Sequence, residues 1–180
     1  MDLLKFHNKI KGYTQNRQPG IEADMEPKPI AELEEYKAAG KLENKVALIT
    51  GGDSGIGRAI AILYAKEGAN VAIGYYDEHQ DAEDTVNRLQ GMGVKAKAYA
   101  HDLKDEKQSQ KLIKDVINDF GGLNILVNNG GVQFPRDHFE DITPQQVKET
   151  FMTNIFGMMF LSQAAVPYLS EGDTIINTTS

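Results

Sequence analysis

Apolar and polar positions along residues 45–180 predict strands and helices in alternation. Short apolar runs recur at 45–50, 70–76, 94–100, 123–128 and 173–178. Longer segments with helical spacing of apolar residues lie between them, over 55–67, 79–91, 105–120 and 144–169. Strand-length runs that alternate with helices are typical of a parallel sheet covered on both faces. The predicted fold class is therefore α/β, a doubly wound parallel sheet.

Residues 1–44 have a different pattern and form a separate segment. The stretches Gln18-Pro19-Gly20 and Glu26-Pro27-Lys28-Pro29 interrupt any regular element. We expect an extended N-terminal arm with a short helix over 30–39. The arm either packs loosely on the surface or reaches a neighbouring subunit. The predicted organisation is thus an arm over 1–44 and one α/β domain over 45–180.

A glycine-rich turn joins the first predicted strand to the first helix. Residues 50–57 read Thr-Gly-Gly-Asp-Ser-Gly-Ile-Gly. Glycines let a backbone turn sharply and approach a pyrophosphate, and a helix N-terminus adds N–H donors and a positive dipole. The spacing is Gly-x-x-x-Gly-x-Gly, which differs from the commoner Gly-x-Gly-x-x-Gly fingerprint. The segment predicts a phosphate cradle; the alternative is a tight turn with a helix cap.

Polar residues and glycines also follow the third and fourth predicted strands. Asp102-Leu103 comes after 94–100, and the run Asn-Asn-Gly-Gly over 128–131 ends the fourth strand. Ligands of doubly wound sheets bind at the carboxyl ends of the strands. We expect both segments to face a ligand, although each is also compatible with an ordinary turn or cap.

Bulk composition excludes several classes of function. The chain has 180 residues, no cysteine and a net charge of −7, which disfavours nucleic acid as a partner and rules out disulfides and thiolate zinc sites. No two of the four histidines have helical ligand spacing, so no metal is expected. Neither a signal peptide nor a run of ~20 apolar residues is present, and we expect a cytoplasmic protein without a membrane partner.

The order of these features closely resembles that of the classical short-chain dehydrogenase/reductase family. The resemblance runs from about Lys45 to Ser180 and includes Asn154 in the long helix and Ser180 after the last strand. It is strongest for a bacterial branch with an N-terminal extension, whose members resemble general stress proteins and glucose-dehydrogenase-like oxidoreductases. The resemblance implies a Rossmann-like domain that binds a nicotinamide dinucleotide. It also implies hydride transfer between that coenzyme and a small carbonyl or secondary alcohol.

Nine residues at the carboxyl ends of the strands are implied to bind the cofactor. Those implied at the pyrophosphate are Gly51, Ser54, Gly55, Ile56 and Gly57. Those implied at the adenine and its ribose are Asp102, Leu103, Asn129 and Gly130. Gly130 replaces the alanine usual in the family, which should matter little because the position needs only a small residue.

The implied catalytic residues are Asn154, which would hold a proton-relay water, and Ser180, which would orient the substrate oxygen. Asn154 is alternatively a structural asparagine with satisfied hydrogen bonds. The family's acid/base is a tyrosine followed four residues later by a lysine, and none of the seven tyrosines has such a lysine. By resemblance the sheet is C-terminally incomplete, with 173–178 as an exposed edge. We therefore expect an inactive fragment; the alternatives are a non-catalytic dinucleotide-binding or interaction module, or a remnant of a disrupted gene.

Two observations on the coenzyme conflict, so the prediction is NAD or NADP. Asp77 lies twenty residues past Gly57, where a carboxylate would favour NAD, whereas family spacing puts the neutral Tyr75 at the deciding position. No arginine or lysine lies between Gly68 and Arg88 to bind a phosphate. In the family the 144–169 helix often forms a dimer interface, so a homo-oligomer, either a dimer or a tetramer, is expected. The substrate is not predicted.

Overall fold

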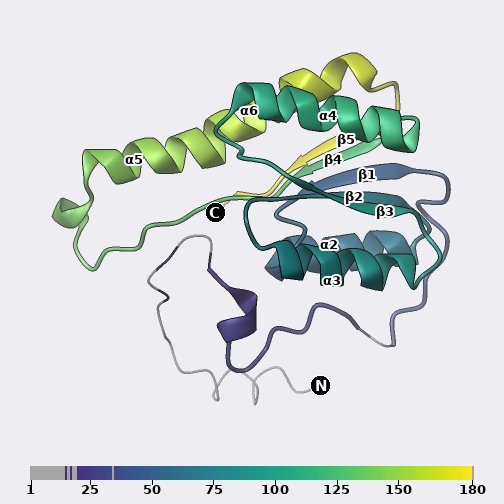
Figure 1. The fold of residues 1–180 in the computed structure, drawn as a ribbon, viewed down its shortest axis with the longest axis horizontal. Coiled ribbons are helices and arrows are strands. Elements are labelled where there is room, and N and C mark those ends of the chain that lie inside the picture. The colour runs from purple at the N-terminus through teal and green to yellow at the C-terminus, as the bar shows by residue number, and fades with distance from the viewer. Residues whose placement is uncertain (1–14, 16, 18–19, 34, 180) are drawn as a thin grey trace.

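A five-stranded parallel sheet forms the centre of the molecule (Figure 1). The computed structural model describes residues 15, 17, 20–33 and 35–179; Ser180 and most of the first nineteen residues lie outside these ranges. The strands are β1 (Val46–Thr50), β2 (Asn70–Tyr75), β3 (Ala96–Ala100), β4 (Ile125–Asn128) and β5 (Thr174–Asn177), in the order β3-β2-β1-β4-β5. The predicted fold class is confirmed, and β5 lies at an edge with mostly exposed residues.

Helices cover both faces of the sheet (Figure 1). On one face lie α2 (Gly55–Lys66) and α3 (His79–Gln90), and on the other lie α4 (Glu106–Phe120) and α6 (Gly157–Ala165); α5 (Pro144–Phe151) extends beyond the sheet. Residues of β1 point alternately into the two cores, Ala47 and Ile49 into the first and Val46 and Leu48 into the second. Burial on both faces explains why this strand reads as a continuous apolar run. No helix in the described ranges is long and apolar enough to cross a membrane.

The long helix predicted over 144–169 is present but not uniform. It starts at Pro144 behind a capping box of Thr143 and Gln146. A π-helical turn, η3 (Met152–Phe156), separates α5 from α6, and a 3-10 turn, η4 (Val166–Tyr168), ends the segment. The π turn carries Asn154, whose side chain is bonded to the backbone of the β4–α5 connection. A local tertiary contact thus accompanies the departure from regular α-helical bonding.

The prediction of a short helix over 30–39 was wrong. Its described residues form no helix, and the only helical turn in the described part of the arm is η1 (Glu22–Asp24). Tertiary contacts satisfy the arm instead: Glu32 pairs with Arg88 of α3 at 2.7 Å and with Lys66 of α2 at 2.9 Å. The described part of the arm therefore lies against its own chain, along the α2–α3 side of the sheet (Figure 1).

Glu67 fastens the end of the arm to the end of α2. Its side chain is 5% exposed and accepts hydrogen bonds from the Tyr36 hydroxyl and from the backbone N–H groups of Ala39 (3.1 Å) and Lys41 (2.8 Å). The Tyr36 hydroxyl, and after it the Lys41 N–H, lower the pKa of Glu67 to about 2. The charged carboxylate is thus the form that the folded chain selects.

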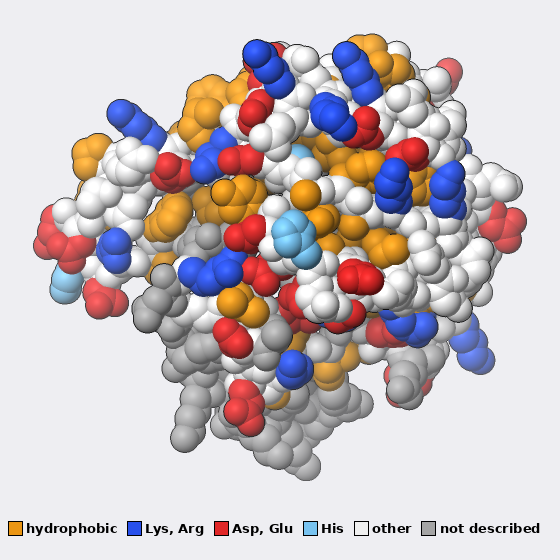
Figure 2. Space-filling view, viewed as in Figure 1, with side chains coloured by type: hydrophobic (Ala, Val, Ile, Leu, Met, Phe, Trp, Pro, Cys, Tyr) orange, Lys and Arg blue, Asp and Glu red, His pale blue; other side chains and the backbone are white. Residues whose placement is uncertain are grey.

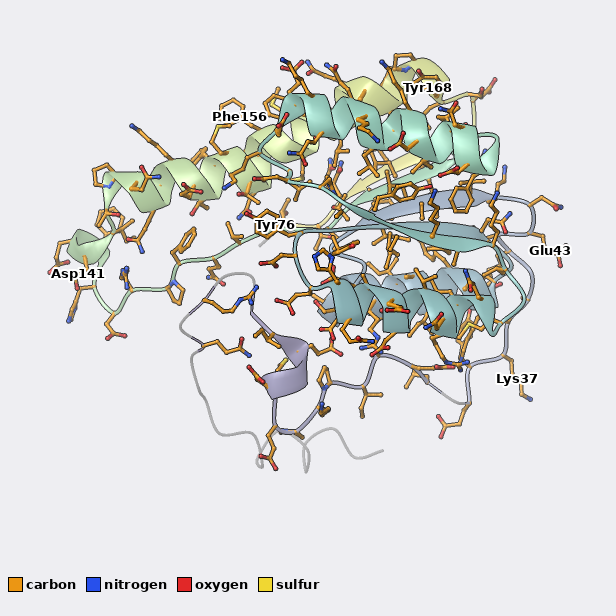
Figure 3. The ribbon with its side chains drawn as sticks, viewed as in Figure 1. Lys37, Glu43, Tyr76, Asp141, Phe156 and Tyr168 are labelled. Carbon is orange, nitrogen blue, oxygen red and sulfur yellow. The ribbon has the colours of Figure 1, made fainter. Side chains whose placement is uncertain are left out.

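We predict that Glu67→Gln lowers the thermal midpoint at pH 7 and weakens its pH dependence in acid. The folded pKa lies below the ordinary value of 4.5, so the stabilisation is complete above about pH 4.5 and is lost as the pH falls toward 2. Circular dichroism melts of both chains across this range measure the difference. The matched control is Glu43→Gln, which removes the same charge from an exposed position (Figure 3). Equal acid dependence in the unmodified chain and Glu67→Gln would contradict the assignment.

Candidate functional site

A pocket of about 510 Å3 opens at the carboxyl ends of the strands. Its walls come from the segments that follow β1, β2, β3 and β4, with Glu149 of α5 and Thr153 of η3 closing one side. Tyr76, which directly follows β2, lines this pocket and is labelled in Figure 3. Eight of the nine predicted cofactor-binding residues line this pocket: Gly51, Ser54, Gly55, Ile56, Asp102, Leu103, Asn129 and Gly130.

Gly57, the ninth, lies behind the wall and lets α2 pack against the glycine turn. A Cβ added to Gly57 would lie 1.9 Å from the Gly51 carbonyl oxygen. Gly51 itself has a φ of +63° and passes within 3.0 Å of Gly130, measured from an added Cβ to the Gly130 Cα atom. Gly55 has a φ of +53°, and an added Cβ meets no described atom within 4 Å. The turn is therefore tight on its protein side, while the Gly55 N–H donates to the Glu22 carboxylate at the helix N-terminus, where a phosphate cradle binds its anion.

The Thr50 hydroxyl joins the ends of β1 and β4. Its Oγ1 accepts hydrogen bonds from the backbone N–H groups of Asn129 (3.0 Å) and Gly130 (2.9 Å). In return the Asn129 side-chain amide donates to the Thr50 carbonyl oxygen at 3.1 Å. Asn129 thus connects β4 to β1, a role that neither interpretation of the sequence predicted, and it also lines the pocket.

Asp102 shapes the wall that follows β3. Its Oδ1 accepts a hydrogen bond from the Lys104 N–H at 2.9 Å, which is the turn role left open by the sequence. The Lys104 ammonium lies 3.8 Å from Asp102 and 3.3 Å from Glu149, and so connects this wall to α5. Asp102 and Leu103 both face the pocket.

Sequence reasoning missed His101 as a pocket residue. Its side chain lines the pocket, is 6% exposed, and neither ring nitrogen has a hydrogen-bond partner among the described residues. Burial lowers its pKa below the ordinary value of 6.5, so the ring is neutral at pH 7. Its place directly before Asp102 is the signal in the sequence that points to this role.

Acidic side chains form the wall nearest the end of β2. Asp53, Asp77 and Glu78 all line the pocket. Burial raises the pKa of Asp53 above its ordinary value, and the charges of Asp81 and Glu78 act in the same direction. Figure 2 shows acidic side chains gathered near the middle of the face that it draws. This part of the site is therefore electronegative.

Asn154 lies just outside the pocket wall. Its amide nitrogen donates to the Val132 carbonyl oxygen and its Oδ1 accepts from the Val132 N–H, both at 2.8 Å. These bonds match the structural alternative, and its role in a proton relay stays a prediction. Ser180 lies outside the described residues, so its predicted role is untested.

A glycine turn at a helix N-terminus, set beside a pocket across the strand ends, is the arrangement typical of doubly wound dinucleotide-binding domains. The model of the short chain dehydrogenase family matches residues 45–180. The chain belongs to this family of oxidoreductases.

Known relatives extend beyond the length of this chain. General stress protein 39 of Bacillus subtilis is 48% identical over 178 residues, covering 99% of this chain and 62% of the relative. Glucose and ribitol dehydrogenase of Daucus carota is 42% identical, covering 92% of this chain and 59% of the relative. A short chain dehydrogenase from Burkholderia cenocepacia, solved in complex with NADP, has a TM-score of 0.75 and 38% identity, over 78% of this chain and 57% of that one. The chain thus spans about three fifths of the length of these relatives.

We predict that Gly57→Ala and Gly130→Ala differ sharply in their cost. Gly57→Ala forces a Cβ onto a backbone oxygen and should destabilise the chain by about 2–3 kcal/mol or more. Gly130→Ala meets the Leu103 Cδ1 at 3.0 Å, a flexible side-chain end, and should cost less than about 1 kcal/mol. Urea unfolding of the three chains measures both values. Equal costs, or the reverse order, would refute this account of the turn.

Proposed function

We propose that this chain binds NAD or NADP in the pocket at the carboxyl ends of its strands. The expected coenzyme class is confirmed by the family and by the NADP complex of the Burkholderia relative. The observation that carries the proposal for this chain is that the glycine turn lines the pocket at the N-terminus of α2.

The residues present fit such a coenzyme. The Gly51–Gly57 turn and the first N–H groups of α2 would hold the pyrophosphate, which would replace the Glu22 carboxylate that accepts a hydrogen bond from the Gly55 N–H. Asp102 and Leu103 would border the adenine, and Gly130 would let the backbone approach the ribose. When bound, the coenzyme supplies or takes up a hydride at its nicotinamide ring. The chain's own residues bind, orient and shield it.

For a complete protein of this family, we propose oxidation of a secondary alcohol or reduction of a carbonyl, with Ser180 orienting the substrate oxygen and Asn154 holding a relay water. Proton transfer needs an acid/base tuned near neutral pH. The family's tyrosine with a lysine four residues later is not found among the seven tyrosines of this chain. We therefore propose that these 180 residues bind coenzyme without turning over substrate, which also favours the non-catalytic binding module as the second candidate.

We predict that the purified chain binds NADP or NAD in calorimetric titration and shows no NADPH or NADH oxidation with small aldehydes, ketones and sugars. Binding follows from the cradle, and the lack of turnover follows from the missing acid/base. Measurable turnover would overturn the inactive proposal while leaving coenzyme binding intact. A chain that is folded by circular dichroism but binds neither coenzyme would overturn the proposed function.

We also propose that the chain self-associates through the outer side of α5, η3 and α6. Large apolar side chains are exposed along this segment and its end: Phe151, Ile155, Phe156, Met159, Val166 and Tyr168. Figure 3 shows Phe156 and Tyr168 on the side of these helices away from the sheet. Several large exposed apolar side chains along one segment are typical of a protein interface.

Light scattering during gel filtration should find a dimer or a larger assembly. The double substitution Phe156→Asp and Met159→Asp should produce a monomer, because charges within an apolar interface lose hydration without gaining partners. Phe139→Asp is the matched control, since Phe139 is 88% exposed on η2 (Phe139–Asp141), outside the proposed face. A monomeric unmodified chain, or an assembly that survives the double substitution, would count against this interface.

A further inference from the structure

The N-terminal arm places an arginine beside the acidic wall of the pocket. Arg17 Nη2 donates to both oxygens of Asp77, at 3.1 and 3.2 Å, and lies 2.6 Å from the Glu78 carboxylate. Both carboxylates line the pocket, where β2 leads into α3. Sixty residues separate Arg17 from Asp77 in the sequence, so only the docked arm brings this charge to the site.

Asp77 lies where a carboxylate affects the preference for NAD or NADP, so its ion pair with Arg17 can change that preference. In doubly wound sheets a carboxylate about 20 residues past the glycine turn holds the ribose hydroxyls of NAD, whereas a nearby arginine accommodates the 2′-phosphate of NADP. Asp77 lies twenty residues past Gly57, and no cationic side chain lies between Gly68 and Arg88. Residues between Gly68 and Arg88 thus offer no cation for a 2′-phosphate, and Arg17 of the arm supplies one.

Arg17 lies among several carboxylates that would otherwise oppose the binding of an anionic group. Asp53, Asp77 and Glu78 line the pocket, and the charge of Asp81 acts on Asp53 from α3. Lys104 also lines the pocket but is paired with Asp102 and Glu149, so without Arg17 these carboxylates would repel a 2′-phosphate. Arg17 offsets two of them, and by binding both oxygens of Asp77 it withdraws that carboxylate from the ribose hydroxyls of NAD.

The arm is held at several points along α2 and α3. Glu22 of η1 pairs with Arg58 at 2.9 Å and also accepts a hydrogen bond from the Gly55 N–H at the start of α2. Further along, Glu32 bridges Lys66 and Arg88. The Glu32 contacts involve no pocket residue, so they support a defined position for the arm even when a pyrophosphate replaces Glu22 at Gly55.

We propose that Arg17 is a specificity-determining residue, acting through Asp77 and Glu78, that makes this pocket prefer NADP over NAD. The inference rests on the proposed binding of coenzyme in the pocket. By this proposal the arm contributes a residue to the coenzyme site that residues 45–180 do not supply.

The test is calorimetric titration of the whole chain with NADP and NAD, and with the minimal probes 2′,5′-ADP and 5′-AMP. Arg17→Ala should weaken NADP and 2′,5′-ADP by about tenfold, which corresponds to roughly 1.4 kcal/mol. It should leave NAD and 5′-AMP unchanged or tighter, since Asp77 is then free for the ribose. Arg17→Lys should retain most of the preference, and Arg136→Ala is the matched control away from the arm. Raising the salt concentration should shrink the difference.

A second variant separates charge from arm structure. In an Arg17→Ala background, Asp77→Asn with Glu78→Gln should restore NADP affinity, because the repelling charges are removed. An unchanged NADP-to-NAD affinity ratio in Arg17→Ala overturns the proposal, as does equal weakening of all four ligands, which would indicate a merely structural arm. Binding of neither coenzyme by the unmodified chain would overturn the proposed function together with this inference.

Discussion

The hydrogen bonds of the Thr50 side chain hold together the two segments on which the pocket depends. The hydroxyl lies at the end of β1 and binds two successive N–H groups after β4. Because Gly51 follows Thr50 directly, the same contact sets the glycine turn against Gly130. Gly51 allows this approach, because a Cβ added to it would lie 3.0 Å from the Gly130 Cα atom. The pocket thus follows from one buried polar contact between central strands.

The opposite wall depends on charge rather than on close packing. Acidic residues after β1 and β2 face the pocket, and the chain balances them with a cation from a segment far away in sequence. The arm is tied down by ion pairs to α2 and α3 and by the buried carboxylate of Glu67. These ion pairs and hydrogen bonds take the place of the internal hydrogen bonds of a helix. They explain how an extended segment can have a defined position.

Sequence pattern was sufficient for the sheet, for most helices and for the glycine turn, because local periodicity and turn chemistry determine them. It failed where contacts between residues far apart in the sequence determine the local structure. The arm around Tyr36 bonds to Glu67 instead of forming a helix, and Asn154 lies in a π turn bonded to Val132. His101 and Arg17 gained their significance only from their neighbours in space. Such long-range side-chain contacts leave no periodic signal in the chain.

Amide hydrogen exchange with and without NADP tests the central claim most directly. The account predicts that NADP slows exchange in residues 51–57 and in the segments that carry Asp102 and Gly130, with little change at the far ends of the strands. These segments form the pocket walls, so a bound coenzyme would shield and order them. Slowed exchange confined to other regions, or no change at saturating NADP, would contradict it.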